Sequence, residues 1–198
     1  MKKMTLVLLG IMLLYGNCTI FNHSNEIIPE EISVLPPFSD NGANTFGCLI
    51  DKAVWVNKGY GPSNVNIYSS TFVYSKQKDS TIIDIKGNMY TYDGKSDDNF
   101  SLGFSGKGIP KAGVTYVLGK NANLRMEYYR RLSNSNIYVI NKSPNPEFNT
   151  ITFSKVDTVS KIVAGRFEGK LVNSTSSYNT LTVSDGRFDI KFQKINPQ

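Results

Sequence analysis

Cysteine and histidine are the side chains best suited to metal binding or nucleophilic catalysis, and this sequence has few of them. It contains two cysteines, Cys18 and Cys48, and one histidine, His23. Structural metal sites need a full set of Cys or His ligands, and the Asp residues lack the spacing of a calcium-binding loop. A Cys-His or Ser-His-Asp site would depend on His23, which we assign below to a linker. We therefore expect no metal, no cofactor and no nucleophilic active site.

Acidic side chains offer the remaining route to catalysis. Glycosidases place two carboxylates on either side of the scissile bond, several ångströms apart. Nothing in the sequence brings two acids together, so scattered surface acids are the ordinary explanation. If two acids did come together, the protein would be a hydrolase that acts on glycans through paired carboxylates. Because the leader described below predicts export, this alternative to a binding or structural role is an envelope hydrolase. Its candidate acids are Asp84, Glu127, Asp157 and Asp189.

Aromatic side chains are the other unusual resource, with 11 Tyr, 11 Phe and 1 Trp. Surfaces that join an aromatic body to a polar handle suit sugars and apolar ligands. Tyr and Phe are also preferred strand residues that pack across sheets, so we expect structural roles for most of them. The candidates for a stacking platform are Trp55, Tyr60, Tyr68, Tyr74, Tyr90, Tyr92, Tyr128 and Tyr129.

The first 17 residues have the pattern of a secretory signal peptide. Lys2 and Lys3 form a short basic region, and an apolar run follows from Thr5 to Tyr15. This run is shorter than the roughly 20 apolar residues that cross a bilayer as a helix. We therefore expect residues 1–17 to be removed on export.

Cys18 stands where the leader ends. The segment resembles a bacterial lipoprotein signal, in which a Cys behind an aliphatic residue and small residues is diacylated and becomes the mature N-terminus. Tyr15 and Asn17 depart from the usual residues of that pattern. We expect lipidation at Cys18 and attachment to a membrane through that anchor, since two or more acyl chains hold durably. A disulfide between Cys18 and Cys48, which an exported compartment permits, remains the alternative.

Residues 18–44 are predicted to be a tether, because prolines and polar residues interrupt any periodicity. Their apolar side chains leave room for a short segment that docks on the domain. Residues 45–198 are predicted to form a single domain. The net charge of +6 is spread among acidic residues, so we expect a solvated mixed surface and no nucleic-acid partner.

The predicted domain breaks into short β-branched and aromatic runs separated by turn residues. The clearest strand is 163–171, where Val163, Phe167 and Leu171 share one face with two glycines while charged residues share the other. A second alternation spans 187–193, and the two strands are expected to pair as a hairpin. These patterns predict an all-β fold of about ten strands, an antiparallel β-barrel or β-sandwich, with a lipocalin-like shape as one form.

Both ends of this domain resemble uncharacterised lipoproteins common in the Bacteroidetes. The opening segment 44–56 reads NTFGCLIDKAVWV, and the closing strand 185–192 reads DGRFDIKF. That family usually has Asn-Gly in the first turn, where this chain has Asp51-Lys52, which makes a tight type I′ turn less secure. The resemblance implies an envelope compartment and a β architecture, with no established activity.

The predicted function is thus that of a lipid-anchored envelope protein, a non-enzymatic binding or structural module. Its partner would be a small apolar ligand, a glycan or another envelope protein. The resemblance implies an outer-membrane location. Acidic residues after the lipidated Cys accompany surface display in that phylum, and Thr19 to Asn22 follow here instead. We therefore expect the periplasmic face.

Overall fold

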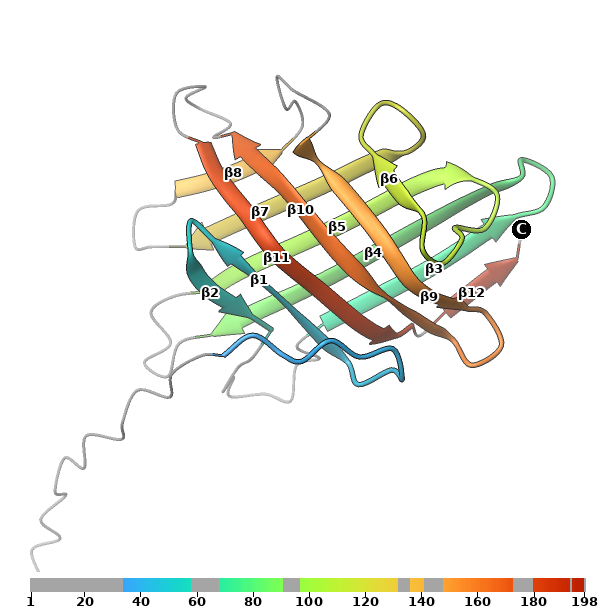
Figure 1. Ribbon diagram of the computed structural model, residues 1–198, viewed down its shortest axis with the longest axis horizontal. Helices are drawn as coiled ribbons and strands as arrows, with labels where there is room; N and C mark the ends of the chain where they lie inside the picture. The colour runs from blue at the N-terminus through green and yellow to red at the C-terminus, as the bar shows by residue number, and fades with distance from the viewer. Residues whose placement is uncertain are drawn as a thin grey trace, which may run out of the picture. The chain divides into compact units, whose positions relative to one another are not determined.

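The computed structural model describes residues 34–57, 68–90, 97–131, 136–140, 148–172, 180–192 and 194–197. Within these ranges the chain forms twelve strands and is all-β, as predicted (Figure 1). Among these residues no helix is long and apolar enough to span a membrane. The strands are β1 (Thr45–Ile50), β2 (Ala53–Val56), β3 (Tyr68–Ser75), β4 (Ser80–Tyr90), β5 (Asp97–Lys107), β6 (Thr115–Val117), β7 (Asn123–Arg131), β8 (Asn136–Ile140), β9 (Thr150–Asp157), β10 (Ile162–Val172), β11 (Thr180–Lys191) and β12 (Lys194–Pro197).

The strands form two sheets of six. Sheet A has the order β2-β1-β11-β10-β9-β6, and sheet B has the order β12-β3-β4-β5-β7-β8. Figure 1 shows the strands of one sheet running across those of the other. The sheets do not close on each other, so of the two predicted architectures the fold is the sandwich. β12, which the sequence did not indicate, pairs with β3 in parallel; the other strand pairs are antiparallel.

Aromatic rings fill the space between the sheets. Phe46 of sheet A lies 5.6 Å from Phe100 of sheet B between ring centroids, and Phe104 lies 5.1 Å from Phe153 in an edge-on contact. These four side chains are at most 2% exposed. Burying each such ring contributes roughly 1.5–3 kcal/mol, so these rings are a main source of stability.

The predicted strand 163–171 forms the centre of β10, with the predicted faces. Val163, Phe167 and Leu171 are buried, whereas Arg166 and Lys170 are exposed. β10 pairs with β11 as the predicted hairpin. Asp185-Gly186, a pair that in a sequence indicates a turn or a bulge, forms a bulge inside β11, because the register against β10 shifts there and Asp185 takes a φ of 50°. β11 is therefore one bent strand.

Gly165 keeps β10 close to its neighbours. A Cβ at this position would lie 2.3 Å from the backbone oxygen of Thr152 and 2.8 Å from the ring of Phe188. Real Cβ contacts do not come this close, so a side chain here would force adjacent strands apart. Of the two roles that a glycine has inside a strand, a close neighbour or a bend, the structure shows the close neighbour at Gly165.

The first turn is tight despite its Asp51-Lys52 sequence. Ile50 pairs with Ala53, and the two intervening residues have φ values of 47° and 71°, as a type I′ turn requires. Asp51 is also bound to β11: its carboxylate accepts the amide of Thr182 at 2.7 Å, and its own amide donates to the Thr182 carbonyl at 2.9 Å. These two bonds hold a turn whose residue types favour it less than Asn-Gly.

Candidate functional site

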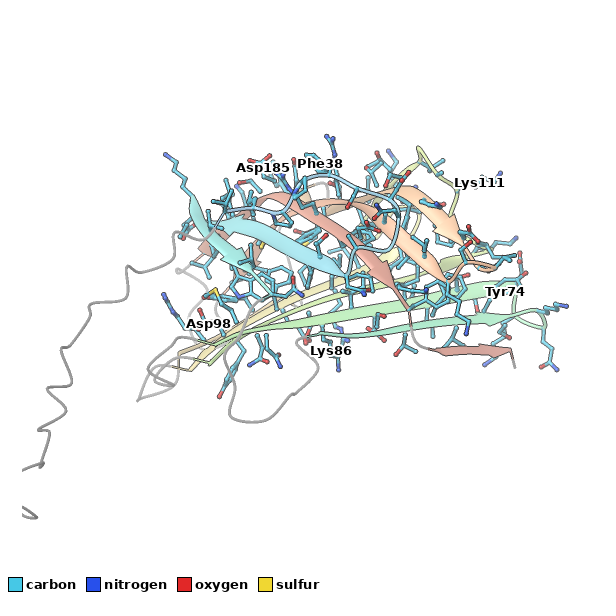
Figure 2. All side chains as sticks on the ribbon, turned by 90° about the horizontal axis from the view of Figure 1, so that it is seen from below. Phe38, Tyr74, Lys86, Asp98, Lys111 and Asp185 are labelled. Atoms are coloured by element: carbon cyan, nitrogen blue, oxygen red, sulfur yellow. The ribbon has the colours of Figure 1, made fainter. Side chains whose placement is uncertain are left out.

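The outer face of sheet A carries a segment that the sequence assigned to the tether. Residues 34–44, here called the strap, precede β1 and are bound to β10 and β11. This is the docked segment that the composition of the tether allowed. In Figure 2 the labels of Phe38 and Asp185 mark this outer face, and Lys86 lies on the opposite outer face of the sandwich.

Asp189 of β11 is the main attachment point of the strap. Its Oδ2 accepts hydrogen bonds from the Ser39 hydroxyl at 2.7 Å and from the amides of Asn41 at 3.1 Å and Ala43 at 3.0 Å. Its Oδ1 accepts the amide of Gly42 at 2.7 Å, a geometry reached with a positive φ of 81° at that glycine. The residue is 1% exposed. One carboxylate thus binds four donors of the strap.

These donors keep Asp189 ionised. Burial by itself would raise the pKa of this carboxyl, because a desolvated charge is costly. The hydrogen bonds from Ser39, Ala43, Gly42 and Asn41 favour the charged form and outweigh burial, so its pKa lies below the ordinary value of 3.8. The negative charge is therefore part of the attachment.

Phe38 fastens the strap a second time. The guanidinium carbon of Arg166 lies 3.6 Å from the centre of its ring, and that of Arg187 lies 4.0 Å away. Arg187 also donates from Nη1 to the carbonyl of Pro36 at 3.1 Å and from Nε to the carbonyl of Asp185 at 3.1 Å. Such cation–π contacts are worth about 0.5–1 kcal/mol each at exposed sites.

A hollow opens beside these groups. Its volume is about 240 Å³, and it lies between the strap and strands β9, β10 and β11. The polar side chains around it are those of Ser39, Asp40, Thr45, Ser154, Arg166, Arg187 and Asp189. Hydroxyl groups and guanidinium groups therefore converge next to an aromatic ring.

Two of the four candidate catalytic acids share one arginine on the outer face of sheet B. Arg125 of β7 reaches Asp84 of β4 at 2.9 Å and Glu127 at 3.8 Å. It crosses the intervening strand β5 at Gly103, where no side chain blocks the path. Arg125 and both acids are about a third or more exposed, so the cluster is a surface network that contributes little energy.

The other two candidate acids have backbone partners. Asp157, the last residue of β9, accepts the amides of Ser160 at 2.8 Å and Val159 at 2.9 Å, and these bonds lower its pKa. Asp189 binds the strap. The structure thus brings Asp84 and Glu127 to one arginine and gives Asp157 and Asp189 separate structural roles. The pKa of Asp157 and that of Asp189 are both lowered, the opposite of what the general acid of a glycosidase needs.

The proposed aromatic platform is divided between the core and the surface. Trp55 and Tyr128 are buried and pack against Phe100. Tyr74 donates its hydroxyl to Asp79 at 3.1 Å, and this bond raises its pKa. Tyr129 is partly buried. The side chains of Tyr60, Tyr68, Tyr90 and Tyr92 lie outside the described residues.

Cys48 is a free thiol that is fully buried in the core, and burial raises its pKa far above the ordinary value of 9.0. This fits the prediction of a small buried hydrophobic side chain. Cys18, the predicted lipidation site, and His23 lie outside the described residues. Within the part of the chain that is described, no three His, Cys, Asp or Glu side chains gather as metal ligands would.

Sequence reasoning did not find the site around Phe38. Alternation along the two strands puts Arg166, Arg187 and Asp189 on their outer faces. Of these three residues only Asp189 was given a candidate function, as one member of a carboxylate pair. The sequence carried no signal that Phe38 and the strap amides would cover them. Comparisons of the chain with protein-family models, with curated proteins and with solved structures find no match.

Proposed function

We propose that this chain is a lipoprotein of the bacterial cell envelope, attached to the membrane through Cys18, whose β-sandwich is a non-enzymatic binding or structural module. The leader 1–17 that ends at a cysteine supports export and lipidation. The proposed location is the periplasmic face of the outer membrane.

The observation that carries this proposal is the strap. The chain that leads from Cys18 to the domain ends in a segment bound to the centre of sheet A by the buried carboxylate of Asp189. A force applied at the anchor would therefore act on β11, an inner strand of sheet A, and not on an edge strand. The residues from Cys18 to Val34 would span at most about 55 Å when extended, which sets how far the domain stands from the membrane.

The proposed partner binds at the surface of the sandwich. Rings of Phe46, Phe100, Phe153 and Phe167, each at most 1% exposed, pack between the sheets. This packing counts against a small apolar ligand held between the sheets in the manner of a lipocalin. A glycan or another envelope protein at the outer face is the partner that the geometry favours.

Fatty-acid labelling tests the anchor. The full chain is expressed in a bacterium that processes lipoproteins, with labelled palmitate in the medium, beside the variant Cys18→Ser. We expect label and membrane association in the wild type and neither in Cys18→Ser. Cys48→Ser is the matched control and should be labelled as strongly as the wild type. Label that persists in Cys18→Ser, or a mature chain that begins well past residue 18, would refute the proposal.

A further inference from the structure

Two arginines face each other on adjacent strands of sheet A. Arg166 of β10 and Arg187 of β11 are paired in the strand register, so both side chains rise from the same face. Among the described residues, no carboxylate lies within ion-pair distance of either guanidinium. Like charges directly opposite each other destabilise a strand pair. The sequence therefore keeps a local repulsion at this position, on the outer face beside the strap.

The contacts that do form leave hydrogen-bond donors free. Arg187 donates to the carbonyls of Pro36 and Asp185, whereas Arg166 contacts the ring of Phe38 and has no hydrogen bond to another described residue. A guanidinium offers five N–H donors in a planar fork that matches a carboxylate. Arg166 is thus available to a ligand, and Phe38 holds it in place.

The size and lining of the hollow limit what that ligand can be. Its volume of about 240 Å³ equals roughly eight times the space of one water in the liquid. That is room for one sugar ring or one amino acid. The hydroxyls of Ser39, Thr45 and Ser154 line it together with the two arginines, so the ligand is expected to carry hydroxyl groups as well as an anionic group.

The acids around the hollow favour a single negative charge on the ligand. Asp189 lines it, but both of its oxygens are occupied by strap donors. Asp40 also lines the hollow and is exposed. Two arginines against these two acids leave no net formal charge around the hollow, so the second charge of a phosphate gains nothing over a single carboxylate paired with Arg166.

We propose that this hollow binds a small sugar acid, whose carboxylate pairs with Arg166 and whose hydroxyl groups meet Ser39, Thr45 and Ser154. The inference deepens the binding role proposed above and rests on it. It does not depend on the anchor, so fatty-acid labelling and ligand binding can fail separately.

The test is a binding titration of the full chain in detergent micelles, with D-glucuronate as the probe. We expect binding to be at least about tenfold weaker for Arg166→Gln, since a charge-assisted hydrogen bond is lost. Lys170→Gln is the matched control: this residue lies on the same face of β10 but outside the hollow, and glucuronate affinity should not change. Asp40→Asn should strengthen binding severalfold by removing a repelling charge.

Three further probes separate the parts of the proposal. D-Glucose lacks the carboxylate and should bind at least about tenfold more weakly than glucuronate. Cyclohexanecarboxylate has the six-membered ring and the single carboxylate but no hydroxyls, and affinity equal to that of glucuronate would overturn the assignment of a sugar. Binding of inorganic phosphate more tightly than glucuronate would overturn the inference that the ligand carries a single negative charge. No binding of glucuronate, or equal binding by a folded Arg166→Gln variant, would overturn the site itself. Urea unfolding of each variant confirms that it is folded.

Discussion

The side chains of Ser39 and Asp189 are joined by a 2.7 Å hydrogen bond although 150 positions separate them in the sequence. This bond attaches the strap, which precedes the first strand, to β11, the second strand of the hairpin formed by β10 and β11. Together with three backbone amides it makes Asp189 the attachment point for the whole strap.

Asp189→Asn is expected to loosen the strap. The amide side chain keeps one acceptor oxygen but loses the charge and places a donor opposite the strap amides. We expect a loss of about 2 kcal/mol in the free energy of unfolding, the range of hydrogen bonds to a buried charge. Urea unfolding measures this loss, and limited proteolysis should show new cleavage within residues 34–44.

The control for this variant is Asp185→Asn. Asp185 lies on the same strand and is exposed, and Asn tolerates its positive φ of 50°. Stability and proteolysis should stay at wild-type levels. If both variants lose the same stability, the strap is not held by the carboxylate of Asp189.

The same carboxylate makes stability depend on pH. Because hydrogen bonds hold the pKa of Asp189 below its ordinary value of 3.8, the unfolded chain binds a proton more readily than the folded chain does. This contribution is fully present above the unfolded pKa and is lost as pH falls through the folded pKa. The stability gap between wild type and Asp189→Asn should therefore be constant from pH 5 to 7 and shrink below about pH 4.

A gap that stays constant down to pH 2 would show that the pKa of Asp189 is the same in the folded and unfolded chains, so that the strap hydrogen bonds do not favour its ionised form. Asp157 also has a lowered pKa and adds to the acid sensitivity of both proteins. Since it is present in both, the difference between the two proteins isolates Asp189.

Gly165→Ala is expected to be strongly destabilising. Its Cβ would meet the backbone oxygen of Thr152 at 2.3 Å, so a strand of sheet A must shift. The cost should exceed about 3 kcal/mol, at the upper end for overpacking. Gly113→Ala is the comparison, because its Cβ meets nothing within 4 Å and only its φ of 78° opposes the change. Thermal unfolding should rank Gly165→Ala far below Gly113→Ala, and the reverse order would contradict the close strand packing.

Lys52→Gly should stabilise the protein. Lys52 is exposed and adopts a φ of 71°, which costs an L-residue roughly 1 kcal/mol relative to glycine. Urea unfolding should show a rise in the free energy of unfolding of up to about that size. The rise is reduced because glycine has more conformational entropy in the unfolded chain. Lys111→Gly, at an exposed position with an ordinary φ, should lose a few tenths of a kcal/mol instead. A lower free energy of unfolding for Lys52→Gly would show that the Lys52 side chain stabilises the fold by more than its backbone strain destabilises it.

Cys48 should be unreactive in the folded protein. Its thiol is fully buried and its pKa is raised, so little thiolate forms and reagents do not reach it. In the full chain with Cys18→Ser, maleimide labelling at neutral pH should be slow without denaturant and complete in concentrated urea. Rapid labelling of the native protein would contradict the buried position.

The strand pattern was readable from the sequence because each strand buries one face, and alternating residues report that burial directly. The faces of 163–171 and its pairing with the alternation at 187–193 followed from this pattern, and the structure extends the partner strand to 180–191. β12 escaped notice because it is short and ends at Pro197, so it carries no alternation of its own. Asp185-Gly186 indicated a turn or a bulge, because a left-handed residue serves both purposes, and only the pairing of β11 with β10 decided for the bulge.

The sequence by itself determined most of the strands and their buried faces, and it predicts a leader that ends before Cys18. Only the tertiary structure decided that the sheets stay open as a sandwich, and that residues 34–44 lie on sheet A. The physical reason is range: alternation reports the local environment of each strand, whereas the site depends on contacts between distant segments. Asp189, Arg166 and Phe38 acquire their roles from strap atoms brought to them across more than a hundred residues, and no local pattern records that meeting.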